Sequence, residues 1–347
     1  MALKQIDPRT DPLWLKLLER YPSTVFHGPA WMNVLTDTYG FEPSAYVVVD
    51  DKGEPLAGVP FCVVEDVNGI DVISMPFSDF TDPLVEDEAH WNEMMEALLK
   101  INHPITVRAL KNDIPRNDER FYERSKAKWH GIDLSPSVED VWNNFSGSAR
   151  RAVRKGEKQG VTVEASNTKE GMRAFFDMHL HVRKDKYHLV PQPWAFFEHI
   201  WERFMKEDKG TVMLAKHEGK VIGAVVFLIW ENTLTYKFNA SLFEYQEYRP
   251  NDSIIWNGIQ WGKERGCTAF DFGLSDWDQE GLLQFKRKFA SEEGKISFLY
   301  HVPEGQDNLN KGPIRSVFGQ LTTLLTDESV PDEITEKAGE VLYRYFR

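Results

Sequence analysis

Apolar residues alternate with polar ones in two places along this chain, and both places predict a β-hairpin. Residues 46–49 and 56–64 have the alternation of strands, and the turn between them holds Gly53, which accepts positive φ. Residues 212–215 and 221–230 have the same pattern around a second short turn. Two hairpins of this kind predict two sheets, or two parts of one sheet.

The two hairpins belong to a longer repeat. Placing Gly53 on Gly219 (219 − 53 = 166) aligns them without a gap and puts Phe61 on Phe227. The same offset relates an apolar helical face before each hairpin, Trp31, Val34 and Leu35 in one case and Phe197, Ile200 and Trp201 in the other. Agreement in two separate elements indicates a duplication, although any two helix–hairpin units share some of this pattern.

After each hairpin the pattern continues as a strand, a helix and a strand. These elements are expected at 70–74, 88–101 and 105–110, and again at 233–240, 253–265 and 268–273. The predicted fold class is therefore α/β (α+β), with two tandem domains, each a mixed, mostly antiparallel sheet flanked by helices.

Domain limits follow from the repeat. We expect a first domain at 1–145, which ends after a polar helix that Ser137 caps, and a second domain at 146–304. Residues 310–325 and 331–346 have the pattern of two amphipathic helices. We expect this tail, 305–347, to pack back on the first domain.

Charge limits the partners of the chain. A net charge of −13 repels nucleic acid and anionic membranes on average, so contact with a polyanion requires a local basic patch. Residues 148–158 supply one. The longest apolar run, 221–230, is too short to cross a membrane, the first residues have no apolar core of a signal peptide, and the two cysteines lie in apolar surroundings. These features predict a cytoplasmic protein with reduced thiols.

The order strand, loop, helix, strand over 233–273 resembles the central unit of the GNAT N-acyltransferases. In those enzymes a glycine-rich loop before the helix presents backbone N–H groups to the pyrophosphate of acyl-CoA. Here the loop at 244–252 has no glycine and contains Glu244 and Glu247. The architecture is thus GNAT-like without the usual CoA signature.

This combination resembles the FemAB family, the peptidoglycan bridge-forming transferases built from two GNAT-like domains. Five stretches occur in the order of the family: 76–84 (PFSDFTDPL), 150–161 (RRAVRKGEKQGV), 249–251 (RPN), 270–273 (FDFG) and 281–286 (GLLQFK). The resemblance implies transfer of an amino acid from aminoacyl-tRNA to an amine, often on a UDP-linked muropeptide or a lipid-linked peptidoglycan precursor. It implies no cofactor besides the donor, and the long coiled-coil arm of some members is absent from this sequence.

Catalytic candidates follow from this chemistry. The resemblance places Lys286 beside the reacting carbonyl, where its ammonium would stabilise the oxyanion, but it also fits a solvated charge in a basic run. Asp79 and Asp271 are the candidates for a base that takes the proton of the attacking amine. The alternative is a substrate-assisted transfer, which requires no base from the protein. Asp79 and Asp82 equally fit a capping role around Pro83.

Candidate substrate-binding residues are mostly cationic. Arg150 and Arg154 share one helical face, and Arg151 and Lys155 share the next, which suits phosphate recognition or a solvated helix. Arg183 and Tyr187 lie one helical turn apart. The remaining candidates lie in the family stretches: Asp82, Arg249 and Asn251.

Metal binding is not expected, because His179 and His181 are two residues apart on a helix and point to different faces. Three functions remain in view: a FemAB-like aminoacyltransferase, an acyl-CoA-dependent N-acyltransferase, and a non-catalytic GNAT-like binding module. The family stretches and Lys286 favour an enzyme, and the glycine-free loop disfavours CoA.

Overall fold

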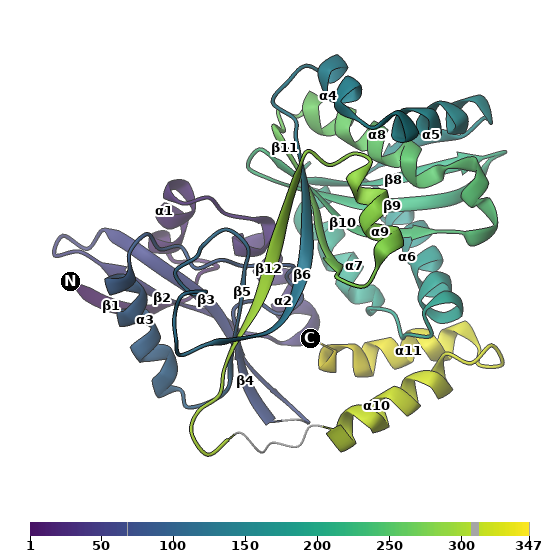
Figure 1. Ribbon diagram of the computed structural model, residues 1–347. Coiled ribbons are helices and arrows are strands. Elements are labelled where there is room, and N and C mark those ends of the chain that lie inside the picture. The colour runs from purple at the N-terminus through teal and green to yellow at the C-terminus, as the bar shows by residue number, and fades with distance from the viewer. Residues whose placement is uncertain (68, 307–311, 347) are drawn as a thin grey trace. The chain divides into compact units, whose positions relative to one another are not determined.

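The computed structural model describes residues 1–67, 69–306 and 312–346, and its chain forms two compact units (Figure 1). Unit 1 comprises Met1–Trp129 and Gly294–Ser316, and unit 2 comprises His130–Glu293 and Val317–Phe346. The chain enters unit 2 within strand β6 (Tyr122–Asp133) and returns to unit 1 within β12 (Glu292–His301).

Unit 1 contains a sheet in the order β1-β2-β3-β4-β5-β12, in which only the β4–β5 pair is parallel. Its strands are β1 (Ala2–Ile6), β2 (Pro43–Val49), β3 (Pro55–Asp66), β4 (Gly69–Ile73) and β5 (Ile105–Ala109). Its helices are α1 (Pro12–Arg20), the 3₁₀ turn η1 (Val25–His27), α2 (Pro29–Tyr39) and α3 (Glu88–Lys100).

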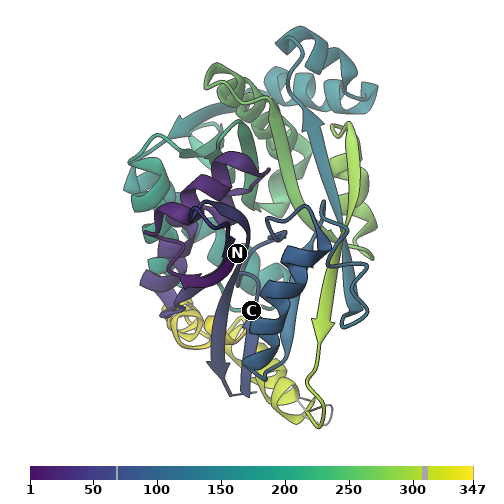
Figure 2. The ribbon, with the colours of Figure 1, turned by 90° about the vertical axis from the view of Figure 1, so that its left-hand side faces the viewer.

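Helices cover both faces of this sheet because side chains of a strand alternate between faces. On β3, Val59 and Phe61 belong to the core cluster that contains Trp91 of α3. Gly58, the residue before Val59, faces α1, where an added Cβ would lie 2.6 Å from Leu17. Figure 2 shows the purple helices α1 and α2 and the blue helix α3 on opposite sides of these strands.

Unit 2 repeats this plan with strands in the order β11-β10-β9-β8-β7. The strands are β7 (Thr162–Ser166), β8 (Gly210–His217), β9 (Lys220–Trp230), β10 (Thr233–Ser241) and β11 (Ala269–Asp276). The helices are α4 (Val138–Asn144), α5 (Gly147–Lys158), α6 (Lys169–His181), α7 (Trp194–Ile200), α8 (Pro250–Glu264), α9 (Glu280–Arg287), α10 (Gly312–Leu325, of unit 2 from Val317) and α11 (Asp332–Leu342). Short turns complete it: the π-helical η2 (Val182–Lys186) and η3 (Trp201–Met205), and the 3₁₀ turns η4 (Phe243–Tyr248) and η5 (Tyr343–Tyr345).

In the second sheet, too, the side chains of each strand alternate between two faces, and helices pack on both faces. Val225 and Phe227 of β9 pack in one cluster with Ile254 and Ile259 of α8. Gly258 allows this close approach, since a Cβ there would lie 2.7 Å from the Phe227 ring. Helix α6 also packs on β8, β9 and β10.

The predicted repeat is present in the topology. In both units a hairpin is followed by an antiparallel strand, a helix and a parallel strand, in β2-β3-β4-α3-β5 and β8-β9-β10-α8-β11. The gap-free offset of 166 is wrong by one residue, because the two strands of the second hairpin pair one residue out of step with those of the first. Val47 pairs with Gly58 whereas Met213 pairs with Val225 (47 + 166 = 213, 58 + 166 = 224), because the two turns and their bulges differ.

The expected domain limits differ from the units in two ways. Unit 2 begins at His130, not 146, because Val141 and Phe145 pack in the cluster of α8. It ends at Glu293, and Ser297–His301 of β12 pair with β5 in unit 1. The tail expected on the first domain belongs to unit 2 from Val317 onward. Residues 307–311 and 347 of that predicted tail lie outside the described residues.

Direct contacts explain where the tail belongs. Lys184 of η2 is buried and its Nζ lies 2.7 Å from the Asp332 carboxylate of α11. Arg173 of α6 pairs with Glu336 at 3.2 Å. Gly339 packs directly against the Pro191 carbonyl. In the sequence these charges look like solvated ones, so the pattern alone does not reveal their partners.

Candidate functional site

Strands β10 and β11 part halfway along their length, and the candidate site lies where they separate. They pair in parallel at Thr233, Leu234 and Thr235 of β10. Beyond Thr235, β10 stays paired with β9 as far as Ser241, and β11 continues to Asp276. An opening between parallel strands presents unpaired backbone groups to an extended ligand.

In unit 1 the corresponding place is occupied by the chain itself. Strand β4 ends at Ile73, and the segment Thr81–Leu84 takes its position. The Thr81 amide donates to the Arg108 carbonyl of β5 at 2.9 Å, and Leu84 exchanges two hydrogen bonds of 2.8 Å with Gly58 of β3. No such bridging segment is present between β10 and β11 among the described residues of unit 2. The open counterpart therefore belongs to unit 2.

Lys286 of α9 reaches this opening. Its side chain is buried, and its ammonium donates to the carbonyls of Phe272 at 2.8 Å, Leu274 at 2.9 Å and Gly273 at 3.3 Å. These carbonyls belong to the part of β11 that has left β10. The interpretation of Lys286 as a solvated surface charge is wrong, because a buried ammonium is held at the strand edge.

Asp271 stands at the point of separation. It is the last residue of β11 paired with β10, opposite Thr235. Its Oδ1 accepts a 2.7 Å hydrogen bond from the Gly273 amide, and Gly273 has φ of 64°. The carboxylate thus stabilises the bend of β11, and its role as a base remains a prediction.

The start of α8 has its own charges. Asn251 donates to Ser241 of β10 and accepts from Asn239, so it ties the helix to the strand edge. Asp252 in the first turn is buried and pairs with Lys288 at 2.6 Å. A carboxylate at this position complements the positive end of the helix and opposes a diphosphate there. Arg249 is exposed and has φ of 60°, which its neighbours must hold.

Helix α5 carries the basic patch and packs against this helix start. Gly156 permits the contact, since its Cβ would meet Ser253 and lie 3.1 Å from the Tyr248 carbonyl. Figure 1 shows α4, α5 and α8 together in unit 2.

The two cationic faces of α5 differ in their contacts. Arg150 donates to the Asn143 carbonyl at 2.5 Å, and the Arg154 guanidinium lies 5.5 Å from the centre of the Trp142 ring, so both hold α4. Arg151 and Lys155 are exposed, and no side-chain partner is recorded for either in the described structure. The second face is therefore the one available to a ligand.

Tyr236 of β10 also lies at the opening, and the sequence alone did not predict it as a site residue. Burial raises the pKa of its phenol, and the nearby Tyr187 and Asp252 raise it further. Tyr187 itself is 52% exposed, so it is free to meet a ligand. The signal that points to Tyr236 is its place on β10 just past the last pair with β11.

Arg183 has a structural contact as well as a predicted binding role. Its guanidinium donates to the Val190 carbonyl at 3.0 Å and lies 5.8 Å from the Tyr343 ring centre of the tail. These contacts hold the segment that carries Tyr187.

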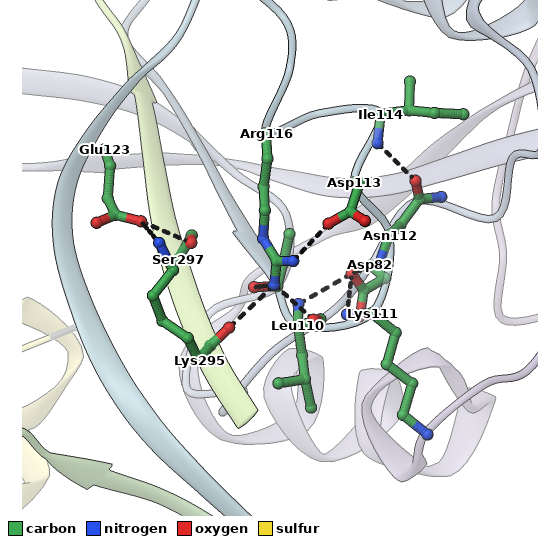
Figure 3. A network of polar contacts seen from close by, with 11 residues as sticks. Asp82, Leu110, Lys111, Asn112, Asp113, Ile114, Arg116, Glu123, Lys295 and Ser297 are labelled. Atoms are coloured by element: carbon green, nitrogen blue, oxygen red, sulfur yellow. Dashed lines mark hydrogen bonds and ion pairs between the residues drawn. The ribbon is translucent and has the colours of Figure 1, made fainter. Parts of the chain in front are cut away.

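Asp79 and Asp82 belong to unit 1 and are both buried. Asp82 Oδ1 accepts from the amides of Leu110, Lys111 and Asn112 at 3.0, 3.1 and 3.0 Å, which stabilises the loop after β5 (Figure 3). Burial raises the pKa of this carboxyl against the lowering effect of those amides. Asp82 is thus a cap, as one alternative predicted, although the amides follow β5 and not Pro83.

The described residues hold neither a candidate metal cluster nor a candidate membrane span. They contain no cluster of three or more His, Cys, Asp or Glu side chains arranged to hold a metal. No helix among them is long and apolar enough to cross a membrane.

Comparison with known proteins concerns the fold and the sequence of the chain. Residues 143–287 match the model of the acetyltransferase (GNAT) domain. The lipid II:glycine glycyltransferase of Staphylococcus epidermidis is 27% identical over 115 residues, which cover 29% of this chain and 28% of that protein. The crystal structure of FemX superposes with a TM-score of 0.63 at 14% identity and covers 85% of this chain and 96% of FemX. These findings support the resemblance to the FemAB family.

A tandem GNAT protein from the clavulanic acid biosynthesis pathway also shares the fold of this chain. Its TM-score is 0.57 at 11% identity, with 88% of this chain and all of that chain covered (100%). The sequence match to the staphylococcal relative spans little more than a quarter of that relative's length. The GNAT match includes α5, Asp271 and Lys286 but neither Asp79 nor Asp82.

Proposed function

We propose that this protein is a FemAB-like aminoacyltransferase that forms an amide bond between an activated amino acid and an amine, with the donor ester held at the opening between β10 and β11. The observation that carries the proposal is the buried Lys286 ammonium on the edge of β11 where the strands separate. An acyl group lying in this opening has a fixed cation beside its carbonyl.

The reaction needs few protein groups. The amine nitrogen of the acceptor attacks the ester carbonyl carbon, the C–N bond forms, and the carbonyl electron pair moves to oxygen. The ester C–O bond then breaks, and the departing ribose oxygen takes the proton that the amine loses. Lys286 stabilises the oxyanion by exchanging its longest contact, 3.3 Å to the Gly273 carbonyl, for the new negative oxygen.

Aminoacyl-tRNA is the donor that this site favours over acyl-CoA. The start of α8 holds its own carboxylate, Asp252, and the preceding loop carries Glu244 and Glu247 without a glycine. These groups disfavour a diphosphate at the position where GNAT enzymes bind one. The cations of α5 lie along a helix, which suits a polymer of phosphates.

The acceptor in this proposal is an amine on a peptidoglycan precursor, lipid-linked or UDP-linked. The name of the staphylococcal relative, lipid II:glycine glycyltransferase, supports the first form. We place the reaction in the cytoplasm, where charged tRNA is available. No cofactor is needed besides the donor.

The test is a donor comparison. The protein is incubated with a lipid-linked or UDP-linked muropeptide and either a mixture of radiolabelled aminoacyl-tRNAs or labelled acetyl-CoA, and label in the peptide is measured. We expect transfer from tRNA that depends on the acceptor. Transfer from acetyl-CoA alone would contradict the proposal.

An acyl-CoA-dependent N-acyltransferase is the second candidate. The match of residues 143–287 to the GNAT model favours it, as does the opening between parallel strands. The same donor comparison separates the two functions.

A further inference from the structure

Helix α10 exposes a row of large apolar side chains. Val317, Leu321 and Leu324, at i, i+4 and i+7, are 55%, 37% and 67% exposed. Single exposed apolar residues are ordinary on a protein surface, whereas three on one helical face form a patch. All three belong to unit 2. We call these three residues the α10 row and treat them as a candidate docking surface.

Another side of α10 is packed, and this packing fixes the position of the row. Thr322 is buried, and Phe318 contacts Tyr345 of η5 with ring centres 5.6 Å apart. The Thr335 hydroxyl of α11 donates to the Leu325 carbonyl at 2.8 Å. Figure 1 shows α10 beside α11, which ion pairs with α6 and η2 hold on unit 2. The α10 row therefore lies on an ordered helix of the unit that contains Lys286.

The sequence around the α10 row differs in charge from the rest of the chain. Residues 308–326 contain no aspartate or glutamate, and Lys311 and Arg315 are their only charged residues. The whole chain has a net charge of −13, so on average it repels an anionic surface. An apolar row within an acid-free, slightly basic run complements an anionic lipid surface.

Neighbouring acids limit the docking surface to α10. Glu333 and Glu340 of α11 are exposed, as are Asp327 and Glu328 after the end of α10. These carboxylates oppose an anionic surface, so insertion of apolar side chains has to supply most of the affinity. We therefore expect weak, reversible binding that added salt changes little.

The size of the α10 row favours a lipid surface over a second copy of this chain. Its three side chains extend over about 11 Å of helix, at a rise of about 1.5 Å per residue. A stable protein interface uses about 20–30 residues of each partner. A lipid surface needs no complementary shape, and an amphipathic helix binds it through the apolar area that it inserts.

We propose that the α10 row docks unit 2 on a lipid bilayer, with Val317, Leu321 and Leu324 inserted at the level of the headgroups. This inference rests on the proposed function and deepens it, because it selects the lipid-linked acceptor over the UDP-linked one. A lipid-linked acceptor is itself anchored in the bilayer. Weak docking is sufficient there, since the bound acceptor and the α10 row hold the protein on one surface together.

Vesicle binding tests the surface directly. The protein is titrated with vesicles of phosphatidylcholine and phosphatidylglycerol that contain no muropeptide, and bound protein is measured by co-sedimentation. We expect the double variant V317Q/L324Q to bind roughly 10- to 100-fold more weakly, because each side chain is about half exposed and inserts about half of its apolar surface. Gln is a good helix former, so the exposed positions tolerate it.

A matched control replaces two exposed apolar residues on other helices, Leu15 of α1 and Val138 of α4, by Gln. This variant should bind vesicles as the parent does. A parent that does not bind vesicles, or a V317Q/L324Q variant that binds like the parent, overturns the proposal. Sedimentation equilibrium gives a third result against it: if the variant turns a dimer into a monomer at unchanged vesicle binding, a second copy covers the row.

Transfer assays separate this inference from the proposed function. With charged tRNA as donor, V317Q/L324Q should transfer several-fold more slowly to a lipid-linked muropeptide in vesicles. It should match the parent on a muropeptide whose lipid chain is shortened until it is water-soluble. Equal rates of parent and variant on the vesicles overturn the selection of the lipid-linked acceptor and leave the function standing. If the parent transfers to neither acceptor while the variant still loses vesicle binding, the proposed function fails and the docking surface stands.

Discussion

Replacing Lys286 by Met separates the catalytic from the structural part of this residue's role. The change removes an ammonium that donates to three carbonyls, those of Phe272, Gly273 and Leu274. Carbonyls left without a donor cost about 1–3 kcal/mol of stability each, and the removal of a buried charge offsets part of this. We therefore expect a moderate loss of unfolding free energy and a folded variant.

Turnover should fall much further than stability. Loss of one oxyanion donor costs about 10²- to 10³-fold in kcat, or about 2.7–4 kcal/mol of transition-state stabilisation. The assay is single-turnover transfer from saturating donor, which reports the chemical step, together with chemical denaturation of the same preparation. The KM for the donor should change little, because the ammonium acts on the charge that develops during the reaction.

Lys263→Met is the matched control. Lys263 is a lysine of unit 2 at the far end of α8, and its ammonium also donates to backbone carbonyls, those of Leu134 and Pro136. Its replacement should cost comparable stability and leave turnover within a few-fold of the parent. If the two variants lose turnover equally, Lys286 is a structural cation and the catalytic reasoning is refuted.

Three further predictions concern folding. Gly156→Ala should push α5 away from α8, because the added Cβ meets Ser253 and the Tyr248 carbonyl. We expect the free energy of unfolding to fall by about 1–3 kcal/mol in denaturant titrations. An unchanged midpoint would contradict the close contact. Asp82→Ala should destabilise unit 1 more than Asp82→Asn, because Oδ1 accepts from three amides and Asn retains that oxygen, losing only the 3.2 Å bond from Lys111 to Oδ2; equal losses in urea unfolding would show that the amides do not depend on Oδ1. Burial lowers the pKa of His27 to about 4 and of His179 to about 3, so both contribute stability above their ordinary value of 6.5 that is lost as the pH falls below it. His179→Gln should flatten the dependence of unfolding free energy on pH between about 6.5 and 4, and an unaltered slope would exclude this residue as a cause.

Local pattern predicted the elements of the fold well because short-range physics determines them. The alternation of strands and the cap of α4 need only neighbouring residues, and Ser137 does accept from the Asp140 amide. The pairing register was missed by one residue because bulges near Val48 and Ala215 depend on how the strands meet. No periodicity reports such a local irregularity.

The site was only partly predictable for a related reason. A charged residue looks the same in sequence whether it faces water or a partner. Lys286 has its partners 12 to 14 residues away on β11, and Lys184 finds Asp332 148 residues away. Asp82 likewise meets amides that follow a later strand. Long-range partners of this kind are known only once the fold has brought them together.

The occupied position between β3 and β5 has a consequence for inhibitor design. Thr81 and Leu84 already use the strand edges that an extended inhibitor would need in unit 1. A peptide mimic built to lie along a strand therefore has its docking edge, within the described chain, at β10 and β11.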